Sequence, residues 1–379
     1  MPEIVIESLA AGGDGVGHDA SGRVVFVPFT APGDRVRVAI VEERARFARG
    51  TLEELLEPSP LRALPQCGVY GACGGCTWQH LDYAAQLEAK RQILAGALER
   101  IAKLGVGELE VTPSPSPYRY RSRTRVVAKD GRVGYRRRGS HDLCPTSRCP
   151  VLVPELDAEL ARLAAREPQA AEEWELVAGA GGATRATPLR WPLPGEPKLE
   201  LEVCGDRLAF SPGVFVQGNA LLLDALARAV HEAAGSGACA VELFAGAGFF
   251  TLGLARRFRR LVAVESEGRA VADLRANLAR AGLDNVEVLG GRAEVVLARI
   301  GEAEVVVLDP PRTGLPPGLL EAIQAPRVVY VSCDPATLAR DLAGLAARGW
   351  ALEALRGFDL FPQTPHVEAL ATMARPARA

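Results

Sequence analysis

The 379-residue sequence lacks any run of about 18 apolar residues, so it has no stretch that could cross a membrane as a helix. Its first residues, MPEIVIESLA, also lack the basic-then-apolar order of a secretion signal. These two absences predict a cytoplasmic protein with no membrane partner. Internal repeats and low-complexity tracts are missing as well, and 48% hydrophobic with 24% charged residues is an ordinary globular composition. The length then predicts two or three domains.

An excess of positive charge is also missing. The 44 Lys and Arg residues are outnumbered by 46 Asp and Glu residues, and the net charge of −2 argues against a surface that binds nucleic acid throughout. The charge is unevenly distributed, however. Residues 118–141 contain nine Lys or Arg residues and a single acidic residue, Asp130. A locally basic surface is therefore expected within an acidic protein.

The basic segment has the period of a β-strand, because its first arginines occupy every second position. This spacing predicts that Arg119, Arg121, Arg123 and Arg125 share one face of a strand. Three interleaved tyrosines would add base stacking to phosphate contacts, although a solvent-exposed charged strand would show a similar pattern. The predicted nucleic-acid contacts are Arg119, Arg121, Arg123, Arg125, Arg136, Arg137 and Arg138.

The order of patterns along the chain predicts its domains. Residues 1–58 contain short strands separated by turns and predict a small β-barrel, which could be a structural cap or an oligonucleotide-binding module. A helix is expected from about Asp82, and PSPSP then marks a domain crossing. From about Gly213 onward, apolar strands alternate with amphipathic helices, which predicts a parallel sheet with helices on both faces.

A nucleotide-type cofactor site is predicted at the first of these strands. AVELF leads into Ala-Gly246-Ala-Gly248 and a helix expected near Phe249, and Glu265 ends the next strand. Small residues let a cofactor approach the backbone, and the carboxylate can accept both hydroxyl groups of a ribose. A nicotinamide dinucleotide normally requires a fuller glycine motif than GAGFFT, so the sequence favours S-adenosylmethionine.

Another strand of the same sheet ends in Leu-Asp309-Pro-Pro-Arg312. It places a carboxylate at the edge where such sheets bind ligands. Methyltransferases that act on exocyclic amines usually have an aromatic residue after the two prolines. Because Arg312 occupies this position, an amino group is a less favoured methyl acceptor.

A candidate nucleophile, Cys333, follows the apolar strand that ends in YVS. A buried cysteine can be a simple core residue, but this one lies where its strand enters the predicted crevice. Carbon 5 of a pyrimidine needs activation, which a thiolate provides by adding to carbon 6. A base must then remove the proton from carbon 5. FPQTPHVE supplies His366 and Glu368, of which Glu368 is the preferred candidate.

A metal centre is predicted from three closely spaced cysteines with intervening glycines, Cys67, Cys73 and Cys76. Disulfides are not expected in a reducing compartment. Cys149 can complete a set of four thiolates, with Cys144 as an alternative. Four cysteine ligands suit either a [4Fe–4S] cluster or structural zinc, and their spacing does not separate the two.

Taken together, the motifs resemble those of the RNA uracil-5 methyltransferase family. The segments that carry the resemblance are GRVVFVPFTAPGDRV, CGVYGACGGCTWQHLDYAAQLEAK, SPGVFVQGN, LDPPRTG, VSCDPATLARDL and FPQTPHVE. The resemblance implies an α/β class I S-adenosylmethionine-dependent (Rossmann-like) domain, an OB-like TRAM β-barrel and a small α+β iron–sulfur domain. The implied ranges are 1–58 for the barrel, 59–80 with 112–208 for the central domain, and 81–111 with 209–379 for the catalytic domain.

The resemblance also implies roles for individual residues. Cys333 would be the nucleophile and Glu368 the base, and an iron–sulfur cluster becomes more favoured than zinc. The implied contacts to S-adenosylmethionine are Gln217, Phe244, Glu265 and Asp309, to which the glycine motif adds Gly246 and Gly248.

The expected substrate is a uridine in structured RNA. Family members divide between 23S rRNA and the T-loop of tRNA, and the presence of both barrel and cluster favours 23S rRNA. The expected enzyme is a monomer. The alternative hypotheses are a non-catalytic RNA-binding iron–sulfur protein and a nicotinamide-dependent oxidoreductase.

Overall fold

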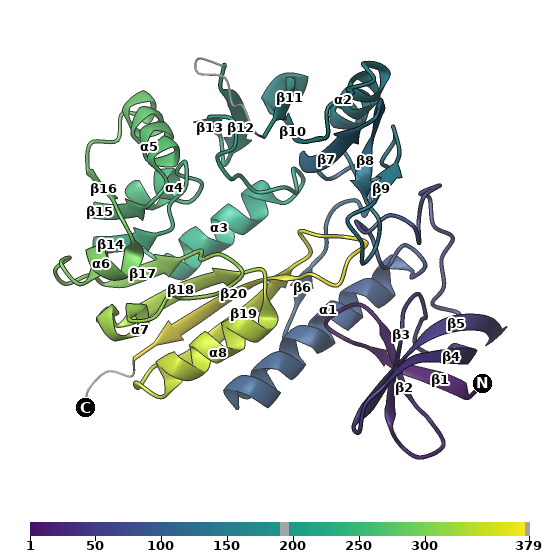
Figure 1. Cartoon of the computed structure of the whole chain (residues 1–379). Helices are drawn as coiled ribbons and strands as arrows, with labels where there is room; N and C mark the ends of the chain where they lie inside the picture. The colour runs from purple at the N-terminus through teal and green to yellow at the C-terminus, as the bar shows by residue number, and fades with distance from the viewer. Residues whose placement is uncertain (190–196, 376–379) are drawn as a thin grey trace.

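The structure, a computed structural model, describes residues 1–189 and 197–375. Figure 1 shows a β-barrel at lower right, a small central sheet at upper right and a large sheet flanked by helices at left. None of the helices in the described ranges is long and apolar enough to cross a membrane.

The barrel is closed and contains five strands in the order β1-β2-β3-β5-β4. The bounds are β1 Glu3–Leu9, β2 Gly15–His18, β3 Val24–Val27, β4 Arg35–Glu43 and β5 Phe47–Glu57. The sequence pattern did not indicate β2, because it lies within the glycine-rich stretch. Its glycines have a packing reason, since a Cβ atom on Gly15 would lie 2.0 Å from Thr30 Oγ1.

The central body is a five-stranded sheet in the order β11-β10-β7-β8-β9. Helix α2 packs on it through Leu156, Leu160 and Leu163, which are fully buried. A separate two-stranded ribbon, β12–β13, follows. The bounds are β7 Arg123–Lys129, β8 Arg132–Arg136, β9 Leu143–Pro145, α2 Pro154–Ala165, β10 Glu172–Ala178, the short helix Ala180–Gly182, β11 Thr184–Pro188, β12 Leu199–Val203 and β13 Asp206–Phe210.

The prediction that four arginines share one strand face is wrong, because β7 begins only at Arg123. Arg119 has a positive φ of 54°. Its backbone N–H donates to Pro150 O, and the N–H of Arg121 donates to Val151 O. These bonds hold the chain in an irregular conformation before the strand. Only Arg123 and Arg125 therefore share a strand face.

The large sheet has the strand order β16-β15-β14-β17-β18-β20-β19-β6. Its neighbours from β16 to β18 are parallel, as predicted, whereas β20 is antiparallel to both β18 and β19. The strand bounds are β6 Val111–Thr112, β14 Gly237–Leu243, β15 Phe258–Glu265, β16 Val286–Gly290, β17 Val305–Leu308, β18 Arg327–Ser332, β19 Ala351–Phe358 and β20 Glu368–Ala374.

Helices cover both faces of this sheet, as the alternation predicts. Helices α3, α4 and α5 contribute to one core, and α1, α6, α7 and α8 contribute to the other. The bounds are α3 Leu223–Ala234, α4 Thr251–Ala255, α5 Gly268–Ala281, α6 Ala293–Leu297, α7 Leu319–Ala322 and α8 Pro335–Ala346.

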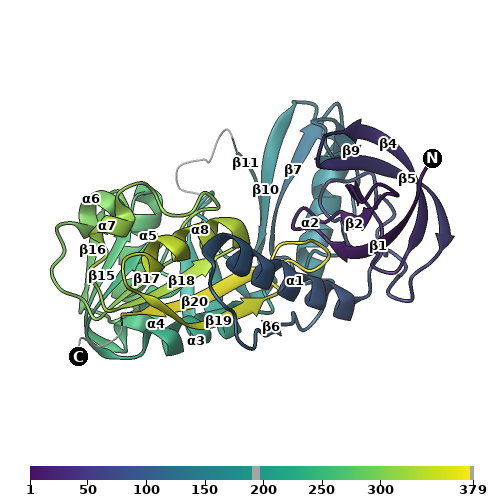
Figure 2. The same ribbon diagram turned by 90° about the horizontal axis from the view of Figure 1, so that it is seen from below.

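Helix α1 (Tyr83–Ala97) and the π-helical turn Leu98–Ala102 pack against α8, although they precede the central sheet in sequence. Asp82 caps α1 by accepting a hydrogen bond from Ala85 N at 2.7 Å. Strand β6 then pairs with β19. Figure 2 shows α1 running alongside the large sheet toward the barrel. This segment therefore joins the large sheet to the barrel.

Candidate active site

Strand alternation directs the predicted site residues to one face of the large sheet. The core beneath α3, α4 and α5 contains Ala263, Val307, Val331 and Leu370. Two positions further along their strands, Glu265, Asp309 and Cys333 lie on the same face at the carboxyl edge. Because β20 runs antiparallel to β18, its first residue, Glu368, also lies at this edge, where Ser332 pairs with Ala369.

Cys333 and Glu368 influence each other electrostatically, together with Asp309 and Arg312. Burial raises the pKa of the Cys333 thiol to about 11, and the nearby Glu368 carboxylate also raises it. Burial likewise raises the pKa of Glu368 well above its usual range, and Asp309 adds to this effect. The Arg312 guanidinium lowers the pKa values of both Cys333 and Glu368. Arg312 therefore favours the thiolate and the carboxylate.

The glycine motif forms a tight turn after β14. Phe244, Gly246 and Gly248 have φ values of 64°, 56° and 104°. A Cβ atom on Gly248 would lie 2.8 Å from Leu274 Cδ1, so this glycine permits the close packing of α5. Helix α4 begins at Thr251, two residues later than predicted.

The two carboxylates predicted at the cofactor site lie on either side of β14. Glu265 Oε2 accepts from Gly246 N at 2.9 Å, which ties the end of β15 to the glycine turn. Its Oε1 already accepts from Ser266 N at 2.6 Å and from Glu267 N at 2.8 Å, so Oε2 is the oxygen that retains a lone pair for a ribose hydroxyl. Gln217 Nε2 lies 3.5 Å from Asp309 Oδ2, and burial raises the pKa of Asp309 to about 7. The arrangement can accommodate a cationic ligand that carries hydroxyl groups.

Comparisons with known proteins identify the family of this chain. Residues 199–375 match the tRNA (Uracil-5-)-methyltransferase family, and residues 3–52 match the TRAM domain. An RNA methyltransferase of Gloeobacter violaceus is 34% identical over an alignment covering 98% of this chain and 96% of the relative. The chain belongs to the RNA uracil-5 methyltransferase family.

Two further similarities come from proteins with assigned targets. RlmD of Pseudomonas aeruginosa, a 23S rRNA (uracil(1939)-C(5))-methyltransferase, is 35% identical, with 97% of this chain and 93% of RlmD covered. The crystal structure of Pyrococcus abyssi tRNA (uracil-54, C5)-methyltransferase in complex with S-adenosyl-L-homocysteine aligns with a TM-score of 0.77 and 25% identity. That alignment covers 98% of this chain and 99% of the archaeal chain.

The predicted family, the enzyme class and the fold of the barrel and the methyltransferase domain are thus confirmed, whereas the iron–sulfur assignment of the central domain stays a prediction. This uracil-5 methyltransferase uses S-adenosylmethionine as the methyl donor and RNA as the substrate. A nicotinamide-dependent oxidoreductase and a non-catalytic RNA-binding protein are no longer favoured.

Sequence reasoning did not single out two residues that the structure brings near the predicted ones. Glu242 on β14 is 2% exposed, and its Oε2 has no hydrogen-bond partner within residues 1–189 and 197–375. Phe215, in contrast, is 66% exposed between buried Val214 and Val216, and the Arg123 guanidinium lies 5.3 Å from its ring centroid. An aromatic residue on the outward side of an alternating segment was the available signal for Phe215.

Glu242 is expected to make the folded protein less stable as the pH rises. Burial raises its pKa from 4.5 to about 8, so between these values the carboxyl is ionised only in the unfolded chain. Glu242→Gln removes this pH-dependent loss, and its stability relative to wild type should rise by at most about 1.4 kcal/mol per pH unit. Thermal unfolding between about pH 5 and pH 9 measures the difference.

The matched control for this prediction is Glu99→Gln, on an exposed site in the π-helical turn that follows α1. It should show no comparable pH-dependent gain. If the stability difference between Glu242→Gln and wild type were constant over the whole pH range, the predicted ionisation would be wrong.

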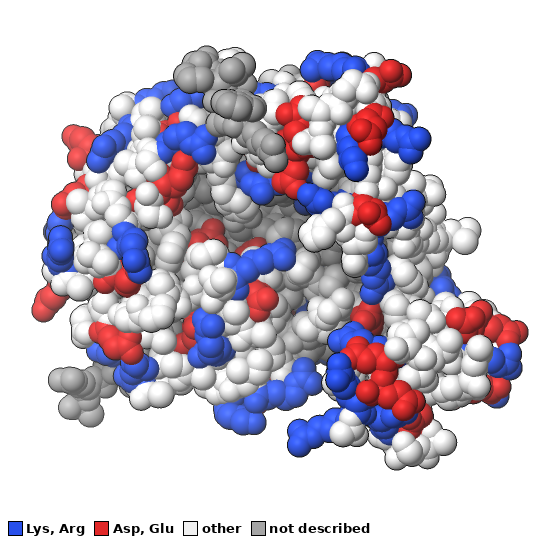
Figure 3. Space-filling view, viewed as in Figure 1, with Lys and Arg blue, Asp and Glu red and all other residues white. Residues whose placement is uncertain are grey.

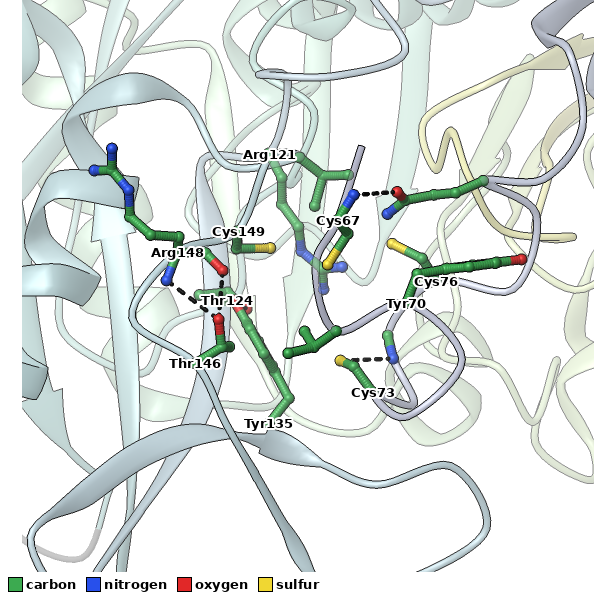
Figure 4. A pocket seen from close by; sticks show the side chains of 14 residues that line it. Cys67, Tyr70, Cys73, Cys76, Arg121, Thr124, Tyr135, Thr146, Arg148 and Cys149 are labelled. Carbon is green, nitrogen blue, oxygen red and sulfur yellow. Dashed lines mark hydrogen bonds between the residues drawn. The ribbon is translucent and has the colours of Figure 1, made fainter. Parts of the chain in front are cut away.

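The four predicted metal ligands surround one cavity. Figure 4 shows the sulfur atoms of Cys67, Cys73, Cys76 and Cys149 around this space, with the Arg121 guanidinium beside them. The alternative ligand, Cys144, is buried in β9 and does not line the cavity. Burial raises the pKa of Cys73 to about 11 and that of Cys76 to about 12, so the thiols hold their protons unless a metal displaces them.

These sulfur atoms are not arranged around a single ion. In the part of the chain that the structure describes, no three His, Cys, Asp or Glu side chains are close enough to bind one metal ion together. Four thiolates around one zinc ion would lie roughly 3.8 Å apart, given zinc–sulfur bonds of about 2.3 Å. A four-iron cluster holds its ligands further apart, because each thiolate binds a different iron atom.

The predicted RNA-binding arginines fall into two groups. Arg123 donates to the buried carboxylate of Glu175, Arg136 to Glu173 at 2.6 Å and Arg138 to Asp14 at 2.8 Å. Arg121 donates to Arg123 O and lines the cysteine cavity. Within the described ranges, the exposed residues Arg119 and Arg137 have no ion-pair partner, and Arg125 approaches Glu175 only to 3.9 Å.

Two of the three interleaved tyrosines are not available for base stacking, and the third, Tyr118, is half-buried. Tyr120 is 2% exposed and donates its hydroxyl to Pro362 O at 2.9 Å, and Tyr135 lines the cysteine cavity. The surface view shows a hollow between the large sheet and the central sheet, with basic and acidic side chains around it (Figure 3). Phe215 is an exposed aromatic side chain that lies beside one of these arginines, Arg123.

Proposed function

We propose that this enzyme methylates carbon 5 of a uridine in 23S rRNA through a covalent intermediate on Cys333. The observation that carries the proposal is the convergence of Cys333, Glu368 and Asp309 at one sheet edge, on the face that also bears Glu265. A nucleophile, a base and a cofactor-binding carboxylate are then within reach of one flipped base.

The proposed reaction begins with the Cys333 thiolate, formed by loss of its proton to solvent. The sulfur bonds to carbon 6 of uracil, and the electrons of the carbon 5–carbon 6 double bond form an enolate. The addition of sulfur thereby makes carbon 5 nucleophilic. Carbon 5 then bonds to the methyl group of S-adenosylmethionine, and the electrons of the broken sulfur–methyl bond stay on the sulfur of the departing S-adenosylhomocysteine.

Glu368 completes the proposed reaction as a carboxylate. It takes the proton from carbon 5, the double bond re-forms, and the carbon 6–sulfur bond breaks to release the Cys333 thiolate. His366 is the less favoured base, since its ring packs against Phe361 with centroids 5.9 Å apart. Burial lowers the pKa of His366 to about 4, so its ring is neutral at physiological pH.

The proposed methyl-donor site combines the glycine turn with the two flanking carboxylates. S-adenosylmethionine supplies the electrophilic methyl group. Glu265 would accept the ribose hydroxyls, and Asp309 with Gln217 would lie nearer the reacting centre. The other proposed contacts are Phe244, Gly246 and Gly248.

The choice of 23S rRNA over tRNA is supported by sequence similarity. The RlmD relative is 35% identical, whereas the archaeal tRNA enzyme is 25% identical. The test is to map 5-methyluridine by mass spectrometry in 23S rRNA and tRNA from a strain lacking this gene. Loss of one 5-methyluridine from 23S rRNA supports the proposal, and loss confined to tRNA overturns this choice of substrate.

The exposed arginines and Phe215 are proposed to contact the RNA around the target base. We expect Arg119→Ala and Arg137→Ala each to lower the salt-dependence slope of RNA binding by about 0.7–1. Arg136→Ala should change it less, because this guanidinium already bonds to Glu173. Affinities measured over a salt series test this. Equal slope changes in all three variants would contradict the division into paired and free arginines.

We also propose that the four cysteines of the central body hold a [4Fe–4S] cluster. The four thiols that line one cavity support the cluster, and Arg121, which lines the same cavity, would offset part of its negative charge. Protein purified without air should contain about four iron and four sulfide ions per chain. Colourless anaerobic protein containing one zinc ion per chain would overturn the proposal. Cys149→Ala should lower the iron content, whereas Cys144→Ala should not.

A further inference from the structure

The loop between β19 and β20 leads into Glu368, and it is held by groups outside these strands. Phe361 O accepts from Lys90 Nζ at 2.9 Å, and Pro362 O accepts from the Tyr120 hydroxyl at 2.9 Å. Lys90 belongs to α1, and Tyr120 belongs to the segment before β7. The position of the loop therefore depends on two other parts of the molecule.

Within this loop, Gln363 forms several hydrogen bonds to residues outside the two strands. It is 2% exposed, and its backbone φ is 69°, a value that residues other than glycine rarely adopt. Its N–H donates to Gln86 Oε1 at 2.9 Å, and its Oε1 accepts from Gln86 Nε2 at 3.0 Å. Gln363 O accepts from both Thr77 N and Trp78 N at 3.0 Å. The surrounding bonds thus maintain an unfavourable backbone conformation.

The Gln86 amide has only one compatible orientation. It is 1% exposed, and its Nε2 also faces Trp78 O at 3.2 Å and Leu81 O at 3.0 Å. Reversing the amide would point an oxygen at these carbonyl groups and an NH₂ group at Gln363 N–H. Buried donors and acceptors without partners cost free energy, so the hydrogen bonds between the two glutamines fix the orientation of both.

The nucleophile is held independently of this glutamine pair. Cys333 immediately precedes Asp334, which caps α8 through Oδ1 by accepting from Ala336 N at 3.0 Å and Thr337 N at 2.9 Å. A shift of the β19–β20 loop would therefore displace Glu368 more than Cys333.

We propose that Gln86 is a positioning residue for proton abstraction, which through Gln363 holds the loop that aims Glu368 at carbon 5. This inference rests on the covalent mechanism of the proposed function. Formation of the adduct and methyl transfer need only Cys333 and the methyl donor, whereas resolution of the adduct needs Glu368 in place. Loss of the glutamine pair should therefore slow the last step selectively.

The test is Gln86→Met, which keeps the length of the side chain and removes its hydrogen bonds. Steady-state turnover should fall about 10- to 100-fold, as expected for a catalytic group displaced by about 1 Å. Adduct formation and the KM values for RNA and S-adenosylmethionine should change less than about threefold. A methylated, SDS-resistant protein–RNA adduct should accumulate. Gln92→Met, the same substitution on the exposed side of α1, should behave as wild type.

Gln363→Gly provides a second variant, since glycine tolerates the positive φ and removes the partner amide. It should accumulate the same adduct. If Gln86→Met does not fold, this variant alone tests the positioning role. Wild-type turnover in either variant, or equal loss of adduct formation and turnover, would overturn the positioning role.

A third variant, Glu368→Gln, separates failure of the positioning role from failure of the covalent mechanism. If it turns over without accumulating adduct, Glu368 is not the base and the proposed mechanism fails at that step. If Glu368→Gln accumulates adduct and neither Gln86→Met nor Gln363→Gly does, only the positioning role of Gln86 fails.

Discussion

Cys333→Ala is expected to lower the rate of uridine methylation by at least about 10⁴-fold, the scale seen when an enzyme loses its nucleophile. The physical reason is that carbon 5 of uracil becomes reactive only after a thiolate has added to carbon 6. The substitution leaves the binding surfaces intact, so affinities for RNA and S-adenosylmethionine should remain near wild type. Single-turnover methyl transfer and equilibrium binding, measured on the same samples, test both parts.

The matched control is Cys239→Ala, the same substitution near the amino end of β14, at the opposite edge of the sheet. This variant should methylate RNA at the wild-type rate. RNA containing 5-fluorouridine gives a second readout, because fluorine cannot leave carbon 5 as a proton. Wild type and Cys239→Ala should form a stable covalent complex with it, and Cys333→Ala should form none. An active Cys333→Ala variant would rule out the covalent mechanism.

Glu368→Gln is expected to stop the reaction one step later. The amide cannot accept the carbon 5 proton, so methylated RNA should remain bonded to Cys333 while turnover falls about 10²- to 10⁴-fold. The fold should tolerate the change, because burial already favours the neutral acid at this position. Denaturing electrophoresis after incubation with RNA and labelled S-adenosylmethionine should show a labelled protein–RNA band.

The double variant Cys333→Ala with Glu368→Gln should lose this band, since no sulfur is left to hold the RNA. Glu99→Gln, on an exposed site, should turn over normally. If Glu368→Gln turned over without accumulating an adduct, another group would have to be the base. His366→Ala would then be the next variant to examine, because His366 lies two residues before Glu368.

The edge that carries the proposed active site could be predicted from sequence because strand ends are a local property. Apolar strands followed by Glu265, Asp309 and Cys333 place these residues at the carboxyl edge of any parallel sheet. The place of Glu368 was harder to foresee. It reaches the same edge only because β20 is antiparallel to β18, and the strand pattern does not reveal direction.

Other features depend on contacts that a local pattern does not contain. Gln86 and Gln363 are separated by 277 positions, and nothing near either residue indicates their pairing. The basic segment was only partly predictable, since hydrogen bonds to Pro150 and Val151 interrupt the strand before Arg123. The alternation of arginines therefore indicated a basic segment correctly, but it wrongly predicted that all four arginines share one strand face.

The most direct test of the account measures loss of the carbon 5 proton together with gain of the methyl group. Target RNA made with tritium at carbon 5 of uridine is incubated with the wild-type enzyme and S-adenosylmethionine. The account predicts that tritium enters water in a one-to-one ratio with 5-methyluridine formation, and that Glu368→Gln transfers one methyl group per enzyme without releasing tritium. Methylation that leaves the tritium on the base would contradict methyl transfer to carbon 5 and the assigned reaction.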